Sequence, residues 1–115
     1  MSKRKKKFLP PSRTPTRKEK IYFKHLQEEL GLGSSVKLLP EKYRVRIPLK
    51  TGVVLSYVPS MVVLGEIDGN VAYHIAKDNE MCDNEKYEFI KNELAEIGFE
   101  FVWVSDEEFP FEEYD

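Results

Sequence analysis

Three side chains able to take part in acid–base chemistry fall in two short segments of this 115-residue chain. Ser60 follows Tyr57-Val58-Pro59, and His74 and Lys77 stand within Tyr73-His74-Ile75-Ala76-Lys77. Each of the three has an ordinary interpretation. A serine after proline is a common turn residue, a lysine at the end of a strand is usually solvated, and a strand histidine is more often half-buried and hydrogen-bonded than catalytic. Their role therefore depends on the elements that position them.

A helix is predicted to open at Thr16. Thr16-x-x-Glu19 is a capping box, in which hydroxyl and carboxylate each satisfy a backbone N–H. Gly31 and Gly33 should end this helix, since glycine accepts the left-handed conformation that follows a helix. Four apolar residues form a stripe at helical spacing: Tyr22, Phe23, Leu26 and Leu30.

Strand patterns occupy the middle of the chain. Tyr43, Val45 and Ile47 alternate with Arg44 and Arg46, which predicts one buried face and one wet, basic face. A second short strand is expected at 53–57. The uniformly apolar run 61–64 is typical of a central strand covered on both faces, and Asp68-Gly69-Asn70 predicts a hairpin into a strand at 71–76.

A second helix and a final strand complete the predicted fold. Asp83 is a good N-cap, Gly98 a good stop, and apolar residues recur between them at spacings of three and four. The alternating segment 99–104 then predicts a strand. The helix before it is long enough to serve as a crossover connection that adds this strand to the same sheet. We therefore predict an α/β fold of order α-β-β-β-(β)-α-β, with a mixed central sheet flanked by helices.

The order of these features resembles the restriction-endonuclease-like PD-(D/E)xK superfamily, and within it small phage and transposon nucleases. The resemblance covers about residues 16 to 106. It is carried by these features: Thr16-x-x-Glu19, Tyr57-x-Pro59, the strand 61–64, Asp68-Gly69, Lys77, and Gly98-Phe99-x-Phe101-x-x-x-Ser105-Asp106. It implies a restriction-endonuclease-like core.

The resemblance also implies where catalysis would occur and why it would fail. Members of this family bind Mg²⁺ through an aspartate after the proline and a glutamate two residues before the lysine. This chain has Ser60 and Ile75 at those positions and keeps only Lys77, which would be vestigial; Glu19 is a further possible site residue. A local charge of about +1 instead of about −1 should not hold Mg²⁺, so no metal site and no cofactor are predicted.

An active enzyme is the alternative. Some nucleases of this superfamily carry the glutamate on the following helix, where Glu85 or Glu88 stands here, and Asp78 or Glu80 follows Lys77 closely. On that interpretation the protein is a Mg²⁺-dependent endonuclease with a relocated glutamate.

The charge distribution points to a polyanion partner. Residues 1–20 hold nine Lys/Arg against one acid, although the whole chain carries a net charge of −2. Such clusters bind phosphates without sequence preference, and no helix-turn-helix, zinc or RNA-recognition signature predicts base reading. A solubility or localisation arm is the alternative. The predicted nucleic-acid-binding residues are Lys3, Arg4, Lys5, Lys6, Lys7, Arg13, Arg17, Lys18, Lys20, Arg44 and Arg46.

The C-terminal segment has the opposite character. Residues 105–115 hold six acids and no base, with aromatic residues at Phe109, Phe111 and Tyr114. Such a segment could dock on a basic partner through its rings, fold back on the chain's own basic arm, or stay solvated. A third hypothesis follows, in which the protein is a small phage-type inhibitor of a host nucleic-acid enzyme.

Length and composition set the frame for these hypotheses. The chain supports one domain, which we place at 16–104 between a disordered basic arm (1–15) and an acidic aromatic tail (105–115). Cys82 is the single cysteine, and no secretory signal or membrane span is recognised, so we expect a cytoplasmic or nucleoid-associated protein. The leading hypothesis is a nucleic-acid-associated protein with a degenerate, inactive nuclease fold that binds DNA or a nucleoprotein.

Overall fold

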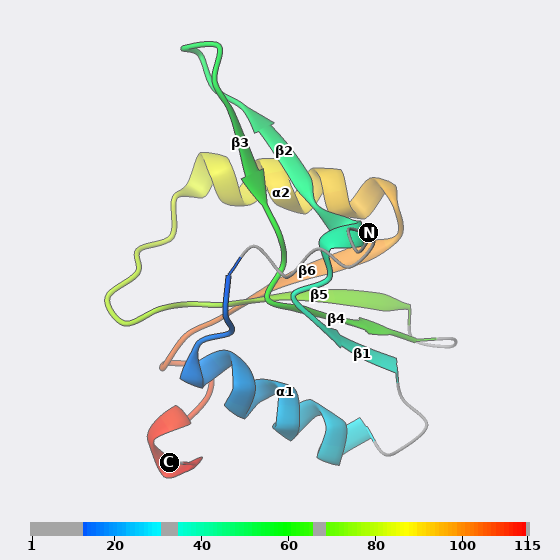
Figure 1. Cartoon of the computed structure of the whole chain (residues 1–115), viewed down its shortest axis with the longest axis vertical. Coiled ribbons are helices and arrows are strands. Elements are labelled where there is room, and N and C mark those ends of the chain that lie inside the picture. The colour runs from blue at the N-terminus through cyan, green and yellow to red at the C-terminus, as the bar shows by residue number, and fades with distance from the viewer. Residues whose placement is uncertain (1–12, 31–34, 66–68, 115) are drawn as a thin grey trace, which may run out of the picture.

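The structure, a computed structural model, describes residues 13–30, 35–65 and 69–114. It is an α/β arrangement with a mixed sheet between two helices (Figure 1). None of its helices is both long and apolar enough to cross a bilayer, within the part of the chain described. The elements in chain order are α1 (Arg17–Leu30), β1 (Ser35–Leu38), η2 (Glu41–Tyr43), β2 (Val45–Pro48), β3 (Val54–Tyr57), β4 (Met61–Leu64), β5 (Asn70–Ile75), α2 (Asn84–Glu96), β6 (Phe99–Val104) and η3 (Phe111–Tyr114).

Four strands form the central sheet in the order β1-β4-β5-β6. β4 pairs antiparallel with both β1 and β5, whereas β5 and β6 run parallel. The parallel pair requires a crossover, and α2 supplies it, as the sequence predicted. The predicted mixed sheet with flanking helices is therefore confirmed.

Both helices begin at the caps that the sequence indicates. At α1, the Glu19 N–H donates to Thr16 Oγ1 at 3.1 Å and the Thr16 N–H donates to Glu19 Oε1 at 2.8 Å, which is the reciprocal capping box. At α2, the Asp83 carboxylate accepts the N–H of Lys86. Gly98 follows α2 with φ of +87°, a conformation that few other residues adopt at low cost.

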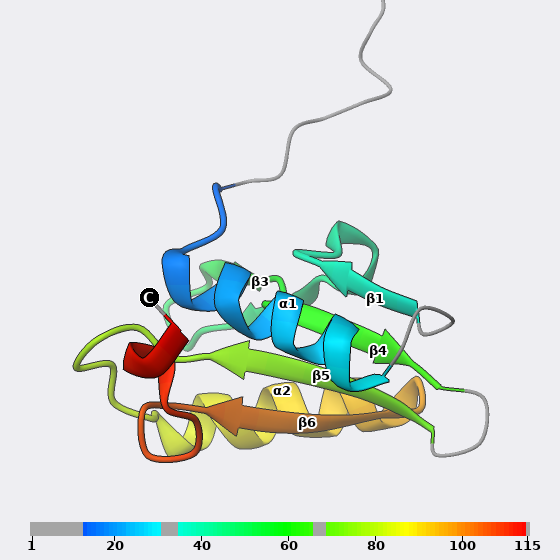
Figure 2. The same cartoon turned by 90° about the horizontal axis from the view of Figure 1, so that it is seen from below.

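The two helices cover opposite faces of the sheet, α1 in front and α2 behind in Figure 2. Side chains alternate along each strand, so the sheet supplies two separate cores. Under α1, Met61 and Ile75 pack with Leu26 and Phe111. Under α2, the buried residues are Val45, Ile47, Val62, Ala72, Ile90, Leu94, Phe99 and Phe101.

Two features of the fold differ from expectation. β1 lies within a stretch that shows no strand pattern, because four residues of an edge strand are too few to display alternation. β2 and β3 pair only with each other among the described strands, and form a separate hairpin instead of joining the central sheet. Val45 and Ile47 of this hairpin pack on α2, which satisfies their apolar pattern without the sheet.

The C-terminal segment folds back against α1. Phe109 and Phe111 are buried, and the Phe109 ring meets Tyr22 edge-on at 5.0 Å between centroids. Lys18 Nζ adds ion pairs to Asp106 at 2.7 Å and Asp78 at 2.5 Å. These two rings are therefore part of the body and not available as anchors for a partner.

Candidate functional site

Ser60 and Ile75 lie next to each other, where β4 begins and β5 ends. Ser60 is 1% exposed, and its Oγ accepts the backbone N–H of Ile75 at 3.0 Å. Its own N–H donates to the carbonyl of Tyr73 at 2.9 Å, and its carbonyl accepts the N–H of Leu39 at 2.8 Å. Every polar group of Ser60 is thus hydrogen-bonded at this end of the sheet.

The Glu19 side chain reaches the same end of the sheet from the first turn of α1. Its side chain is buried, and the Arg13 guanidinium donates to Oε1 at 2.6 Å and to Oε2 at 2.5 Å. Burial alone would raise the pKa of Glu19, but hydrogen bonds from Arg13, Ser60 and Thr16 outweigh it and hold the pKa below its ordinary value. Glu19 is therefore a carboxylate whose charge is balanced inside the protein.

A second polar chain runs alongside on the α2 face. The Tyr57 hydroxyl and His74 Nδ1 are 2.8 Å apart, and His74 Nε2 is 3.0 Å from Glu80 Oε2. The other oxygen of Glu80 accepts the Lys77 backbone N–H at 2.8 Å. His74 is therefore half-buried and hydrogen-bonded, the more common of the two roles that its sequence context suggests.

The protonation of this chain follows from its surroundings. Burial lowers the pKa of His74 below its ordinary value, although the Glu80 carboxylate opposes the shift, so the ring is neutral at pH 7. A carboxylate only accepts, so Nε2 carries the proton and Nδ1 accepts from the Tyr57 hydroxyl. Burial also raises the pKa of Tyr57, which keeps that hydroxyl a donor.

The two polar chains form one group. Arg13 and Glu19 both act electrostatically on Tyr57 and His74, and Glu80 acts on Arg13. We call this group the sheet-end cluster, and its members are Arg13, Glu19, Tyr57, Ser60, His74 and Glu80. The proline between Tyr57 and Ser60 is buried and turns the chain from the hairpin into the central sheet.

A pocket of about 130 Å³ opens beside the cluster on the α2 face. Its walls include Tyr57, His74 and Glu80 together with the rings of Tyr87 and Trp103. The His74 and Trp103 rings lie 4.4 Å apart between centroids. A space of this size admits about one six-membered ring.

The remaining predicted catalytic residues lie outside the cluster. The Lys77 side chain is exposed, and only its backbone N–H reaches the cluster through Glu80. Glu85 and Glu88 are exposed on α2, and Asp78 is paired with Lys18. Glu80 is thus the one relocated carboxylate that the fold brings to the site, among the four that the sequence suggested.

The donor set does not fit a divalent metal ion. Mg²⁺ requires oxygen ligands in a near-octahedral arrangement. Both oxygens of Glu19 accept from Arg13, the Ser60 hydroxyl is shared by Glu19 and Ile75, and the Ile75 side chain has no donor atom. Within residues 13–30, 35–65 and 69–114, no group of three or more His, Cys, Asp and Glu side chains is arranged to hold a metal ion.

The predicted nucleic-acid-binding residues divide into three groups. Lys3, Arg4, Lys5, Lys6 and Lys7 lie outside the described residues. Arg13, Lys18 and Arg44 pair with acids of the chain, Arg44 with Glu41. Arg17, Lys20 and Arg46 are exposed.

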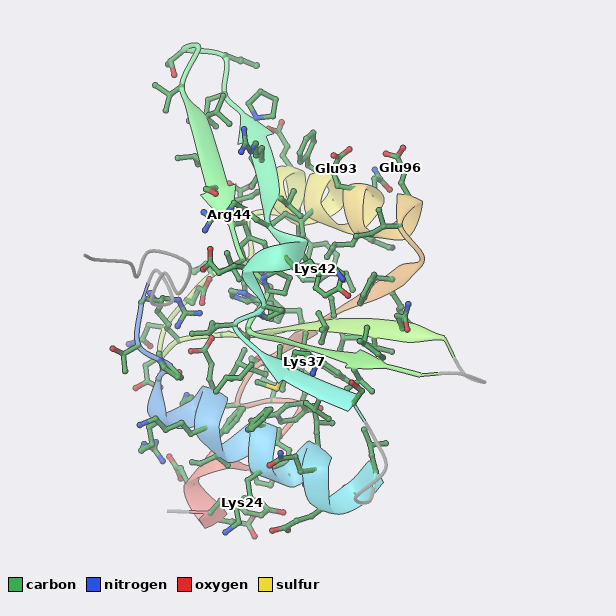
Figure 3. The ribbon with its side chains drawn as sticks, turned by 45° about the vertical axis from the view of Figure 1, so that its right-hand side comes forward. Lys24, Lys37, Lys42, Arg44, Glu93 and Glu96 are labelled. Atoms are coloured by element: carbon green, nitrogen blue, oxygen red, sulfur yellow. The ribbon has the colours of Figure 1, made fainter. Side chains whose placement is uncertain are left out.

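Three bases that the sequence analysis did not select lie on the same side of the molecule as Arg44. Figure 3 shows Lys24 on α1, Lys37 on β1 and Lys42 in η2, with Arg44 at the foot of the hairpin. All four side chains are exposed. No local motif marks them, because they come from different elements and only the fold gathers them.

The partners that hold the cluster together were also not foreseen. Arg13 lies six residues before Glu19, and Glu80 lies six residues after His74, spacings that match no regular element. The proline-containing segment before the capping box was the one available signal, since it keeps Arg13 out of the helix.

Comparison with known proteins found no match. No protein-family model matches the chain, and neither a curated protein nor a solved structure matches it. The functional assignment therefore depends on the residues themselves.

Proposed function

We propose that this protein binds nucleic acid through its basic residues and does not hydrolyse it, using a nuclease-like frame whose site is closed by its own side chains. The observation that carries the proposal is the meeting of Glu19, Ser60 and Ile75 at one end of the sheet. These are the positions where the resemblance to PD-(D/E)xK nucleases implies the metal site. Here the Arg13 guanidinium holds the carboxylate instead of a metal ion.

The charge pattern supports the binding half of the proposal. The sequence of residues 1–20 has a net charge of +8 on a chain whose total is −2. Within this segment, Arg13 is bound to the body of the protein through Glu19. Five bases at positions 3–7 are enough to neutralise several phosphates and release counterions.

The first experiment measures the affinity for a DNA duplex by fluorescence anisotropy across a range of salt concentrations. Affinity should fall steeply with salt, and replacing all five bases at 3–7 by glutamine should lower the log–log slope by about four to five. The control replaces Lys86 and Lys91, two exposed bases on α2, by glutamine. A salt-independent affinity, or no binding at about 50 mM salt, contradicts the proposal.

The second experiment tests the absence of hydrolysis. The same duplex is incubated with the protein and Mg²⁺ or Mn²⁺, and we expect no cleavage because the donor set does not hold either ion. Metal-dependent cleavage that disappears in Lys77→Ala would contradict this half and establish the alternative, an endonuclease with a relocated glutamate.

A further inference from the structure

The β2–β3 hairpin projects from the rest of the fold (Figure 1). Figure 1 shows it extending past α2, with its tip beyond the rest of the body. Val45 and Ile47 fix its base on α2, and the chain beyond them, from Pro48 to Leu55, is exposed throughout. No described strand pairs with the outer edge of β3.

Exposed aliphatic side chains are concentrated in this hairpin. Leu49, Val53, Val54 and Leu55 are 39%, 55%, 56% and 38% exposed. They account for four of the eight large hydrophobic side chains that are exposed in the described part of the chain. Apolar surface gathered in this way usually marks a site of interaction.

The charged side chains of the hairpin itself are all positive. Residues 42–65 contain four bases, at positions 42, 44, 46 and 50, and no acid, in a chain with a net charge of −2. Arg44 is partly neutralised by Glu41 and donates to Ser56 Oγ at 2.6 Å. Arg46 and Lys50 are exposed and make no ion pair with any residue in the described ranges.

The partner that binds such a surface should carry many negative charges and also expose apolar groups that the aliphatic side chains can contact. A second copy of this chain is disfavoured because two hairpins of like charge would repel each other. A nucleic-acid duplex fits, since its phosphates attract the bases and its grooves expose base edges and the thymine methyl group.

The dimensions agree with this occupant. Three residue steps separate Ile47 from Lys50 at the turn, a reach of at most about 10 Å. A major groove is about 8.5 Å deep and about 12 Å wide, and it admits a two-stranded β-ribbon. Ribbons also enter the minor groove, where aliphatic side chains contact or separate the base steps.

We propose that the β2–β3 hairpin is a duplex-binding ribbon, which inserts its aliphatic tip into a groove while Arg46 and Lys50 contact the flanking phosphates. This inference builds on the proposed function and specifies the form of the nucleic acid. Lys37 on β1 and Lys42 in η2, which Figure 3 shows between α1 and the hairpin, add two exposed bases near the foot of the hairpin.

The test compares the affinity of the full chain for a duplex and for one of its single strands, with two double variants. Arg46→Gln with Lys50→Gln should weaken duplex binding about tenfold at about 100 mM salt and lower the salt slope by about two. Val53→Ser with Val54→Ser should reduce the preference for duplex over single strand and leave the salt slope unchanged. The control is again the exposed pair on α2, Lys86→Gln with Lys91→Gln.

Dimethyl sulfate footprinting gives an independent readout, because it methylates guanine N7 in the major groove and adenine N3 in the minor groove. Protection at either position that disappears in the tip variant supports the ribbon. Unchanged protection, or ribbon variants that bind like the control, would overturn it while leaving the proposed function intact. A tip variant that alters self-association in sedimentation instead would assign the hairpin to a second copy. If the unmodified chain bound DNA no better than the variant with the five bases at 3–7 replaced, both proposals would be overturned.

Discussion

The sheet-end cluster and the β2–β3 hairpin differ in whether their polar and charged groups are buried and paired or exposed and unpaired. In the cluster, Glu19 is buried and its charge is balanced by Arg13, and the polar groups of Ser60 are all bonded. In the hairpin, Arg46 and Lys50 make no ion pair within the described residues, and four aliphatic side chains face solvent.

This contrast shows where recognition should be sought. A buried, fully bonded polar network stabilises one arrangement of strands and offers little to a ligand. An exposed element with free charge and apolar surface offers both electrostatic attraction and area to bury. We therefore expect the sheet-end cluster to stabilise the fold, and we consider the hairpin the better candidate for binding.

The largest expected effect on stability comes from removing the buried carboxylate of the cluster, Glu19. Glu19→Ala removes the capping box and leaves the Arg13 guanidinium and the Ser60 hydroxyl without their acceptor. The free energy of unfolding in urea should fall by about 3 kcal/mol. Glu28→Ala, on an exposed face of the same helix, should change it by less than about 0.5 kcal/mol. A loss below about 1 kcal/mol for Glu19→Ala would mean that the cluster is not the stabilising network described.

Ser60→Ala should have a smaller effect on the same measurement. It leaves the Ile75 N–H without a partner in a buried site, which costs about 1–3 kcal/mol. The comparison variant is Ser56→Ala in the hairpin, whose hydroxyl is exposed and bonds only Arg44 among the described residues. Equal effects at the two serines would remove the contrast between the regions.

The pH dependence of stability should reveal His74. Its pKa is lowered in the folded protein, so the unfolded chain binds a proton first as the pH falls below about 7. Stability contributed by the neutral ring is present above the unfolded pKa of about 6.5 and decreases below it, by at most about 1.4 kcal/mol per pH unit. Glu19, with its lowered pKa, loses its contribution only below about pH 4.5.

The measurement compares unfolding free energies at about pH 7 and about pH 5.5 in the unmodified protein and in His74→Gln. The variant should be the less pH-dependent of the two. Identical pH dependence would show that the Tyr57–His74–Glu80 chain does not hold the ring neutral.

The smallest expected effect on stability comes from a substitution at the hairpin tip. Val54→Thr keeps a β-branched side chain at a position that is 56% exposed, so the free energy of unfolding should change by less than about 0.5 kcal/mol. A loss above about 1 kcal/mol would mean that the tip packs against the body, which would weaken the case for a free binding surface.

The local elements could be predicted because their signals are local. The capping box at Thr16, the N-cap at Asp83, the apolar run of β4 and the glycine after α2 each act within one turn or one strand. The position of the hairpin could not be predicted, because Val45 and Ile47 show the same alternation whether they face a sheet or a helix. The resemblance to PD-(D/E)xK nucleases pointed to Ser60, Ile75, Lys77 and Glu19. The structure brings Ser60, Ile75 and Glu19 together and leaves the Lys77 side chain exposed, and the functional implication stays a prediction.

The sequence by itself determined the order of helices and strands, the apolar faces and the uneven charge, since these follow from residue type and spacing along one chain. Only the tertiary structure decided that Arg13 neutralises Glu19, that His74 bridges Tyr57 and Glu80, and that the acidic C-terminal segment packs on α1. These contacts join residues at irregular spacings or from different elements. Their energy depends on burial and on distance in space, and neither quantity can be read along a chain.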